Sequence, residues 1–188
     1  MNDQKRARGR KAEPGDRRLP MGNPVPRISV RNVQRKIAVD VGELEKLATA
    51  AVQHCLRLRK GKRTDLRKLH EIFVWLISDR RISRLHHEFL GESGPTDVMT
   101  FHDGEIFISV ETARRYAREF SNSLMGEIGL DIVHGLLHLH GFDDRTPADA
   151  RRMKNTQEKI LRACSPDRLS GRTNEPIQAS SMPATGLK

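Results

Sequence analysis

The chain has 188 residues, enough for one ordinary domain with a sizeable core and too few for two independent ones. Its 34 lysines and arginines exceed its 24 aspartates and glutamates, and the formal net charge of +10 favours polyanionic partners such as RNA, DNA or an anionic membrane surface. Two distant cysteines argue against a disulfide framework, and the lack of any apolar run typical of a signal peptide or membrane span predicts a cytoplasmic protein without membrane contact.

Composition divides the chain into one folded segment between two tails. Residues 1–25 are charged and rich in glycine and proline, and residues 165–188 are polar with few large apolar side chains, so we expect both tails to be disordered. Residues 1–27 hold eight basic and three acidic residues, about half of the excess charge. The basic tail fits either a solvated extension or an arm that contacts phosphates. The folded domain is predicted to span residues 26–164.

The first part of this domain predicts a strand, a helix and a second strand. Apolar residues nearly alternate with polar ones at 28–33, which is typical of a half-buried strand. Asp40 and Glu43 form a capping-box-like start for a helix that ends at Lys60-Gly61. The β-branched and aromatic run at 70–78 predicts a strand covered on both faces.

The middle of the domain predicts a helix followed by a hairpin. Asp79 is expected to cap a helix that runs to about Leu90, with Gly91 just past its end. The segments 96–101 and 105–110 are strand-like, and the short connection between them carries a glycine where a left-handed residue is needed.

Three further helices complete the domain. The segment 109–120 begins with a capping serine, and another helix is expected at 124–140. The last helix has Thr146 at its cap, Pro147 at its first position and Asp149 at its third, three independent start signals. The sequence therefore predicts a single α/β domain of the α+β type, with a mixed sheet of about four strands packed with about five helices.

The stretch HGLLHLHGFDD fits either a metal site or a packed helix. His134 and His138 are one helical turn apart, so both imidazoles can meet a single ion, whereas His140 is rotated by about 240° from the first of them. Gly141 permits a left-handed turn, after which Asp144 can fold back toward the same face. A histidine pair alone is common in ordinary helices, so the glycine and the aspartate carry the metal interpretation. Two imidazoles and a carboxylate suit zinc in an open site that lowers the pKa of a water toward ~7.

The residues around this stretch limit the chemistry. The helix is apolar nearly all round, so the imidazoles are expected to be partly buried, where unpartnered polar groups are costly. Zinc proteases of the HExxH kind carry a glutamate directly after the first histidine, and Gly135 stands there instead, which argues against a protease or amidase. No residue is assigned as the catalytic base; His140 and Asp143 are the nearby candidates.

These motifs resemble those of a known family. HGLLHLHGFDD resembles the H-G-x-L-H-L-x-G-[YF]-D-H signature of the YbeY family, bacterial zinc-dependent endoribonucleases that act in maturation of small-subunit ribosomal RNA and in ribosome quality control. GPTDVMTF at 94–101 and GEIFIS at 104–109 are similar to the K-P-T-D-V-L-S-F and G-D-I-x-I-S blocks of that family, in the same order. The resemblance covers about residues 26–164 and leaves both tails outside.

The resemblance implies a hydrolase that cleaves single-stranded RNA, has the small ribosomal subunit as partner, and holds one Zn²⁺ per chain through His134, His138 and Asp144. Two departures limit this implication. The third ligand in the family is a histidine, and Asp144 is a harder, negatively charged ligand. The arginine that the family carries before the strand block corresponds to Leu90, which cannot bind phosphate. A catalytically weakened or inactive RNA-binding assembly factor with the same fold is therefore the alternative.

Other residues near these motifs have two interpretations each. Thr96 and Asp97 fit a capped turn that enters a strand, or a substrate contact. Phe73 and Trp75 are expected in the core rather than as stacking platforms for bases. Four basic residues near the motif either line an RNA channel or form a solvated helix face. These are Arg145, Arg151, Arg152 and Lys154.

Overall fold

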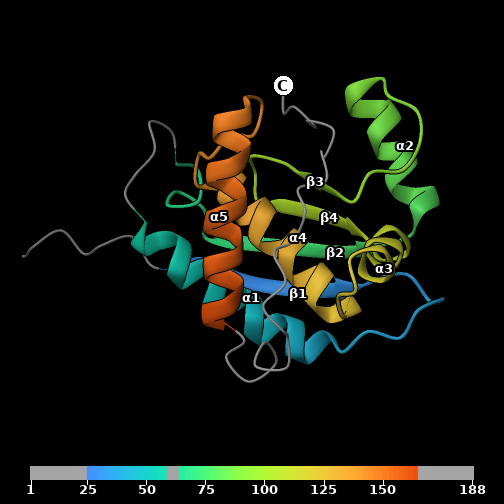
Figure 1. The fold of residues 1–188 in the computed structure, drawn as a ribbon, viewed down its shortest axis with the longest axis horizontal. Coiled ribbons are helices and arrows are strands. Elements are labelled where there is room, and N and C mark those ends of the chain that lie inside the picture. The colour runs from blue at the N-terminus through green and yellow to red at the C-terminus, as the bar shows by residue number, and fades with distance from the viewer. Residues whose placement is uncertain (1–24, 59–63, 165–188) are drawn as a thin grey trace, which may run out of the picture.

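The computed structural model describes residues 25–58 and 64–164, which form a four-stranded mixed sheet packed with five helices (Figure 1). The elements of this part of the chain are β1 (Arg27–Asn32), α1 (Val41–Arg57), β2 (Glu71–Ile77), α2 (Asp79–Leu90), β3 (Val98–Thr100), β4 (Glu105–Ser109), α3 (Val110–Glu119), α4 (Leu124–Leu139) and α5 (Pro147–Cys164). The predicted single α/β domain is confirmed. The two predicted tails, apart from Val25, and the predicted helix end at Lys60-Gly61 lie outside the described residues.

The sheet has the strand order β1-β2-β4-β3. β1 pairs with β2 and β2 with β4 in parallel, whereas β3 and β4 form the predicted antiparallel hairpin. Parallel neighbours need a crossover, and α1 supplies it between β1 and β2. No helix among the described residues is both long enough and apolar enough to cross a membrane.

The helix α4 lies at the centre of the core. It contacts α1, α3 and α5 as well as β3 and β4, and most of its apolar side chains are buried. A Cβ at Gly135 would lie only 2.9 Å from Thr100 Oγ1 and 2.9 Å from two carbons of Ile106. Glycine at this position therefore allows α4 to pack closely on the β3–β4 hairpin, and this contact fixes the rotation of the helix about its axis.

The predicted start of α2 is wrong in one respect. Ser78, not Asp79, is the N-cap, and its side chain makes no capping hydrogen bond. Asp79 lies inside the first turn, and its carboxylate accepts hydrogen bonds from the hydroxyls of Ser109 and Thr112 and from Arg115. These donors lie on or next to α3, far away in the sequence, and together they satisfy the carboxylate better than the local N–H groups would.

The other cap predictions are confirmed. The side chain of Asp40 accepts a hydrogen bond from the backbone N–H of Glu43 at 2.9 Å, and Thr146 accepts one from Asp149 at 3.1 Å. Gly91 ends α2 in the left-handed conformation, with φ at 71°. These signals depend on residues within one helical turn of each other, so the sequence alone was sufficient to predict them.

The strand β2 is not fully covered on both faces, contrary to the prediction. One face carries the buried Val74 and Leu76, but Phe73 and Trp75 on the other face are only half-buried. Their rings stack with centroids 6.1 Å apart. The helix α2 contributes to an apolar cluster on this second face that Trp75 reaches, and its main contact with the sheet is with β4. Phe73 and Trp75 therefore belong to the edge of the core.

Candidate metal centre

The end of α4 turns back on itself as predicted. His140 is the C-cap, and Gly141 follows with φ at 91°, in the left-handed region that favours glycine. The carboxylate of Asp143 then accepts hydrogen bonds from the backbone N–H groups of Asp144 at 2.8 Å and Arg145 at 3.1 Å. This tight turn places the side chain of Asp144 beside the last turn of the helix.

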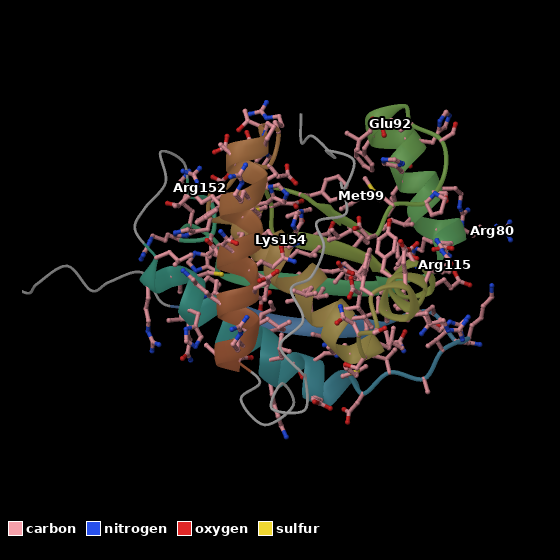
Figure 2. The ribbon with its side chains drawn as sticks, viewed as in Figure 1. Arg80, Glu92, Met99, Arg115, Arg152 and Lys154 are labelled. Carbon is pink, nitrogen blue, oxygen red and sulfur yellow. The ribbon has the colours of Figure 1, made fainter. Side chains whose placement is uncertain are left out.

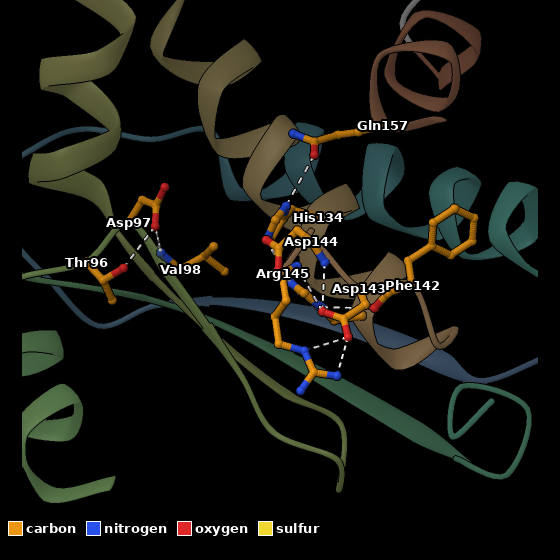
Figure 3. A network of polar contacts seen from close by, with 10 residues as sticks. Thr96, Asp97, Val98, His134, Phe142, Asp143, Asp144, Arg145 and Gln157 are labelled. Atoms are coloured by element: carbon orange, nitrogen blue, oxygen red, sulfur yellow. Dashed lines mark hydrogen bonds and ion pairs between the residues drawn. The ribbon is translucent and has the colours of Figure 1, made fainter. Parts of the chain in front are cut away.

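The three candidate ligands converge on one point, and Figure 3 shows two of them, His134 and Asp144, close together at the end of α4. His134 Nε2 and His138 Nε2 lie 2.9 Å apart, and Asp144 Oδ2 lies 3.7 Å from the first and 3.8 Å from the second. Ligand atoms held 2.0–2.2 Å from one zinc ion at the corners of a tetrahedron lie about 3.3–3.6 Å apart. The observed separations bracket this range, so small side-chain shifts are enough to hold an ion. The side chains of these residues are 12%, 9% and 16% exposed in the same order.

The hydrogen bonds around the rings decide which nitrogens face this point. His138 Nδ1 lies 3.2 Å from the carbonyl oxygen of Phe142, which can only accept, so Nδ1 carries the proton. His134 Nδ1 lies 3.3 Å from Gln157 Oε1, which is also an acceptor. When both rings are neutral and carry their proton on Nδ1, their Nε2 lone pairs lie 2.9 Å apart and repel each other. A cation between them removes this repulsion.

Two further observations fit a cation at this place. Burial, together with the neighbouring His134 ring, lowers the pKa of His138 to about 4, and Asp144 opposes the shift. His138 is therefore neutral at pH 7, as a ligand must be. Asp144 Oδ1 is buried and has no hydrogen-bond partner among the described residues, which is costly for a carboxylate unless a cation compensates. The donor set of two imidazoles and one carboxylate is suited to zinc.

The structure argues against both candidates for the catalytic base. The side chain of His140 is fully buried, and its ring lies 6.1 Å from the Phe142 ring. Hydrogen bonds from Arg145 lower the pKa of Asp143 to about 2, which leaves its carboxylate a weak base. Gly135 points toward the sheet, where a glutamate side chain would collide with Ile106, so the arrangement of HExxH proteases is excluded by packing.

Thr96 and Asp97 form a capped turn, as the structural interpretation predicts. Asp97 Oδ1 accepts hydrogen bonds from the backbone N–H of Val98 at 2.8 Å and from the Thr96 hydroxyl at 3.0 Å. Figure 3 shows this turn to one side of the candidate ligands, and no hydrogen bond links it to them in the described part of the chain.

The four basic residues differ in their surroundings. Arg145 is paired with Asp143, and the guanidinium of Arg152 is paired with Asp149 at 2.8 Å. Arg151 is exposed, whereas Lys154 is half-buried and has no ion-pair partner among the described residues. Figure 2 shows Arg152 and Lys154 on α5. Two of the four cations are thus neutralised locally.

Leu90 occupies an apolar environment. It is the last residue of α2 and packs against the buried cluster formed by Ile77, Ile82 and Met99. A side chain in this cluster contributes to packing and not to phosphate binding.

Two residues of interest near the site were not predicted. Asp131 is buried on the same face of α4 as His134, one turn earlier, and its burial, with Asp97 and Glu127 nearby, raises its pKa well above the usual value. A carboxylate inside an apolar helix was a signal that could have identified it. Gln157 gave no such signal, because only the packing of α5 on α4 brings it to His134.

Comparison with known proteins identifies the family. The family described as Endoribonuclease YbeY matches residues 29–165 of this chain. Proteins with that name include one from Anaeromyxobacter, 39% identical over 103 residues (50% of this chain and 54% of that protein). Another, from Bacillus pumilus, is 30% identical over 142 residues (65% of this chain and 89% of that protein). The chain thus spans about half the length of the first relative and most of the second.

A solved structure has the same fold. The solution structure of TM1509 from Thermotoga maritima is 24% identical, covers 82% of this chain and 99% of its own, and has a TM-score of 0.55. At this identity the likeness concerns the fold alone. With the family match over most of the described domain, it leads to one conclusion: the chain belongs to the YbeY family.

Proposed function

We propose that this protein is a zinc-dependent endoribonuclease that cleaves single-stranded ribosomal RNA of the small subunit, in its maturation and in ribosome quality control. The observation that carries the proposal is the convergence of His134 Nε2, His138 Nε2 and Asp144 Oδ2 at the end of α4, in a member of the YbeY family. One ion per chain is expected, because these residues are the one group of this kind among the described residues.

The residues of the proposed metal site have different roles. When bound, Zn²⁺ supplies Lewis-acid chemistry, which activates water and offsets the negative charge of a phosphodiester. His134, His138 and Asp144 hold the ion, and burial of their side chains keeps competing water away from them. The carbonyl of Phe142 orients the His138 ring, and Asp143 holds the turn that presents Asp144.

The charge of the protein supports a polyanionic substrate. The formal net charge is +10, and the Arg145 side chain, 67% exposed, directly follows the ligand Asp144. Two of its guanidinium nitrogens bond to Asp143, which leaves other N–H groups for a phosphate. Lys154 offers a second cation without an ion-pair partner among the described residues. We expect the cytoplasm as the location, where ribosomal RNA is available.

A second candidate function is a ribosome-associated RNA-binding or assembly factor with weakened or absent catalysis. The observation that favours it is the apolar environment of Leu90, at the position where the family carries an arginine. The carboxylate of Asp144 also lowers the net positive charge of a loaded site relative to three histidines. Both changes weaken electrostatic stabilisation of a phosphodiester transition state and leave RNA binding possible.

Cleavage of a single-stranded fragment of small-subunit ribosomal RNA, by protein of measured zinc content, tests the proposal. We expect cleavage that stops with a chelator, returns with added Zn²⁺, and is absent from His138→Ala. His87→Ala, an exposed histidine on α2, is the matched control and should cleave normally. Bound zinc and RNA binding without chelator-sensitive cleavage would favour the assembly factor instead. Hydrolysis of casein would point to a protease.

A further inference from the structure

We propose that Gln157 is a positioning residue for His134, and that it couples metal binding to the packing of α5 on α4. The inference rests on the proposed metal centre and adds a residue outside the ligand set. Gln157 lies in α5, and its Oε1 is 3.3 Å from His134 Nδ1, on the far side of the ring from the ligand atom Nε2 (Figure 3).

The surroundings of Gln157 explain why this contact is more than incidental. The interface between α4 and α5 is apolar: Met153, Ile160 and Leu161 of α5 are buried, and a Cβ at Gly129 would lie 3.0 Å from Leu161 Cδ1. A half-buried amide in such an interface is costly unless its polar atoms are paired. The Nδ1–H of His134 is the partner of Gln157 Oε1. The packing of α5 on α4 therefore holds the Gln157 side chain where it can accept a hydrogen bond from the His134 ring.

The acceptor decides which nitrogen of His134 binds the metal. A neutral imidazole carries one proton, and an acceptor at Nδ1 keeps the proton there and leaves the Nε2 lone pair for a cation. His138 obtains its acceptor from the carbonyl of Phe142, which the turn after α4 supplies from the backbone. His134 depends instead on one side chain from another helix. The orientation of the His134 ring therefore depends on the position of α5, whereas that of the His138 ring does not.

The same contact links metal binding to helix packing. A cation on Nε2 makes the Nδ1–H a stronger donor, so its bond to Gln157 strengthens when metal is bound. By thermodynamic linkage, a well-packed α5 raises metal affinity by the same factor by which metal stabilises the packing. Metal should therefore increase the protection of α5 amides from hydrogen exchange. This increase should be smaller in a variant that lacks the Gln157 acceptor.

Three variants of the full chain test the proposal through metal affinity. Gln157→Leu removes the acceptor at similar volume, Gln157→Glu keeps an acceptor, and Asn155→Leu replaces an exposed amide on the same helix as a matched control. In competition with a chromophoric chelator, Gln157→Leu should bind Zn²⁺ roughly 10- to 100-fold more weakly, the loss typical for a partner of a metal-binding histidine. The other two variants should stay near the wild-type affinity.

A spectroscopic readout separates positioning from general loss of structure. Co²⁺ in place of Zn²⁺ gives visible bands that report ligand geometry, and these should change in Gln157→Leu but not in Asn155→Leu. In the metal-free wild-type protein, long-range ¹H–¹⁵N spectra should find the His134 proton on Nδ1. This second measurement needs no variant and decides the question even if Gln157→Leu fails to fold.

The outcomes distinguish this inference from the proposed function. Wild-type zinc affinity and cobalt bands in a folded Gln157→Leu, or a His134 proton on Nε2, would overturn the role of Gln157 and leave the nuclease proposal standing. Failure of the wild-type protein to bind any divalent ion would overturn both.

Discussion

The Asp143 carboxylate accepts three hydrogen bonds from Arg145, one from its backbone N–H at 3.1 Å and two from its guanidinium, of which the bond from Nε is 2.7 Å long. Between these two residues lies Asp144, whose own N–H donates to the same carboxylate. Asp143 thus fixes the turn that carries the third candidate ligand, although Asp143 is not itself one of the candidate ligands.

Asp143→Ala should therefore weaken zinc binding, because Asp144 loses the hydrogen bonds that hold its turn. A reduction of about tenfold is the expected size for loss of an outer-shell partner. Arg145→Ala should have a smaller effect, because the Asp143 carboxylate still accepts the backbone bonds in that variant. Zinc affinity by chelator competition measures both. Equal losses in the two variants would show that the ion pair, and not the backbone turn, fixes Asp144.

The prediction from sequence succeeded where the determining contacts were local. The caps of α1 and α5, the spacing of His134 and His138, and the left-handed Gly141 all depend on residues within about one turn of each other. The juxtaposition of Asp144 with the histidines also followed, since only six residues separate it from His138. Local rules of helix geometry were sufficient for these features.

The features that the sequence did not predict depend on tertiary contacts. The cap assigned to Asp79 was wrong because its carboxylate finds better donors on α3, which no local rule contains. Gln157 was missed because 23 residues separate it from His134 and only the packing of α5 joins them. The incomplete cover of Trp75 follows from the position of α2, which the strand pattern cannot specify.

Zinc should stabilise the wild-type protein and not His138→Ala. At a free concentration 100 times the dissociation constant, a ligand of the native state adds about 2.7 kcal/mol, and a rise in Tm of roughly 5–15 °C follows for a domain of this size. Thermal unfolding followed by circular dichroism, with zinc and with chelator, measures the shift. A similar rise in His138→Ala would place the ion elsewhere on the protein.

In the metal-free protein, the low pKa of His138 should make stability depend on pH. The unfolded histidine takes up a proton near pH 6.5, whereas the folded one does so only near 4, so stability is lost as pH falls between these values and is constant above. The loss is at most about 3 kcal/mol. Urea unfolding with chelator at pH 7 and pH 5 should reveal it in the wild-type protein and a smaller loss in His138→Gln. Equal pH dependence in both would assign the effect to other groups.

Asp131→Asn should stabilise the protein at neutral pH, by roughly 1 kcal/mol. Burial, with Asp97 and Glu127 nearby, raises the pKa of Asp131, so above the ordinary value near 4 the unfolded state releases a proton that the folded state keeps. Stability is therefore lost as pH rises from about 4, and the amide avoids this loss. Urea midpoints should show a gain at pH 7 that shrinks toward pH 4. Asp103→Asn, on the exposed hairpin turn, is the control, and a gain there of equal size would contradict the explanation.

Gly135→Ala should destabilise the protein despite the higher helix propensity of alanine. The added Cβ would lie 2.9 Å from Thr100 Oγ1 and from carbons of Ile106, so α4 must move away from the hairpin, at a cost of about 1–3 kcal/mol. Gly42→Ala in α1 is the matched control, because the nearest atom to its added Cβ is 3.6 Å away. Propensity alone should raise the stability of that variant by up to about 1 kcal/mol. We therefore expect the urea midpoints of the two variants to shift in opposite directions. Because α4 carries both histidines, Gly135→Ala should also lower zinc affinity. A stable Gly135→Ala with unchanged zinc affinity would mean that this close contact does not position the site.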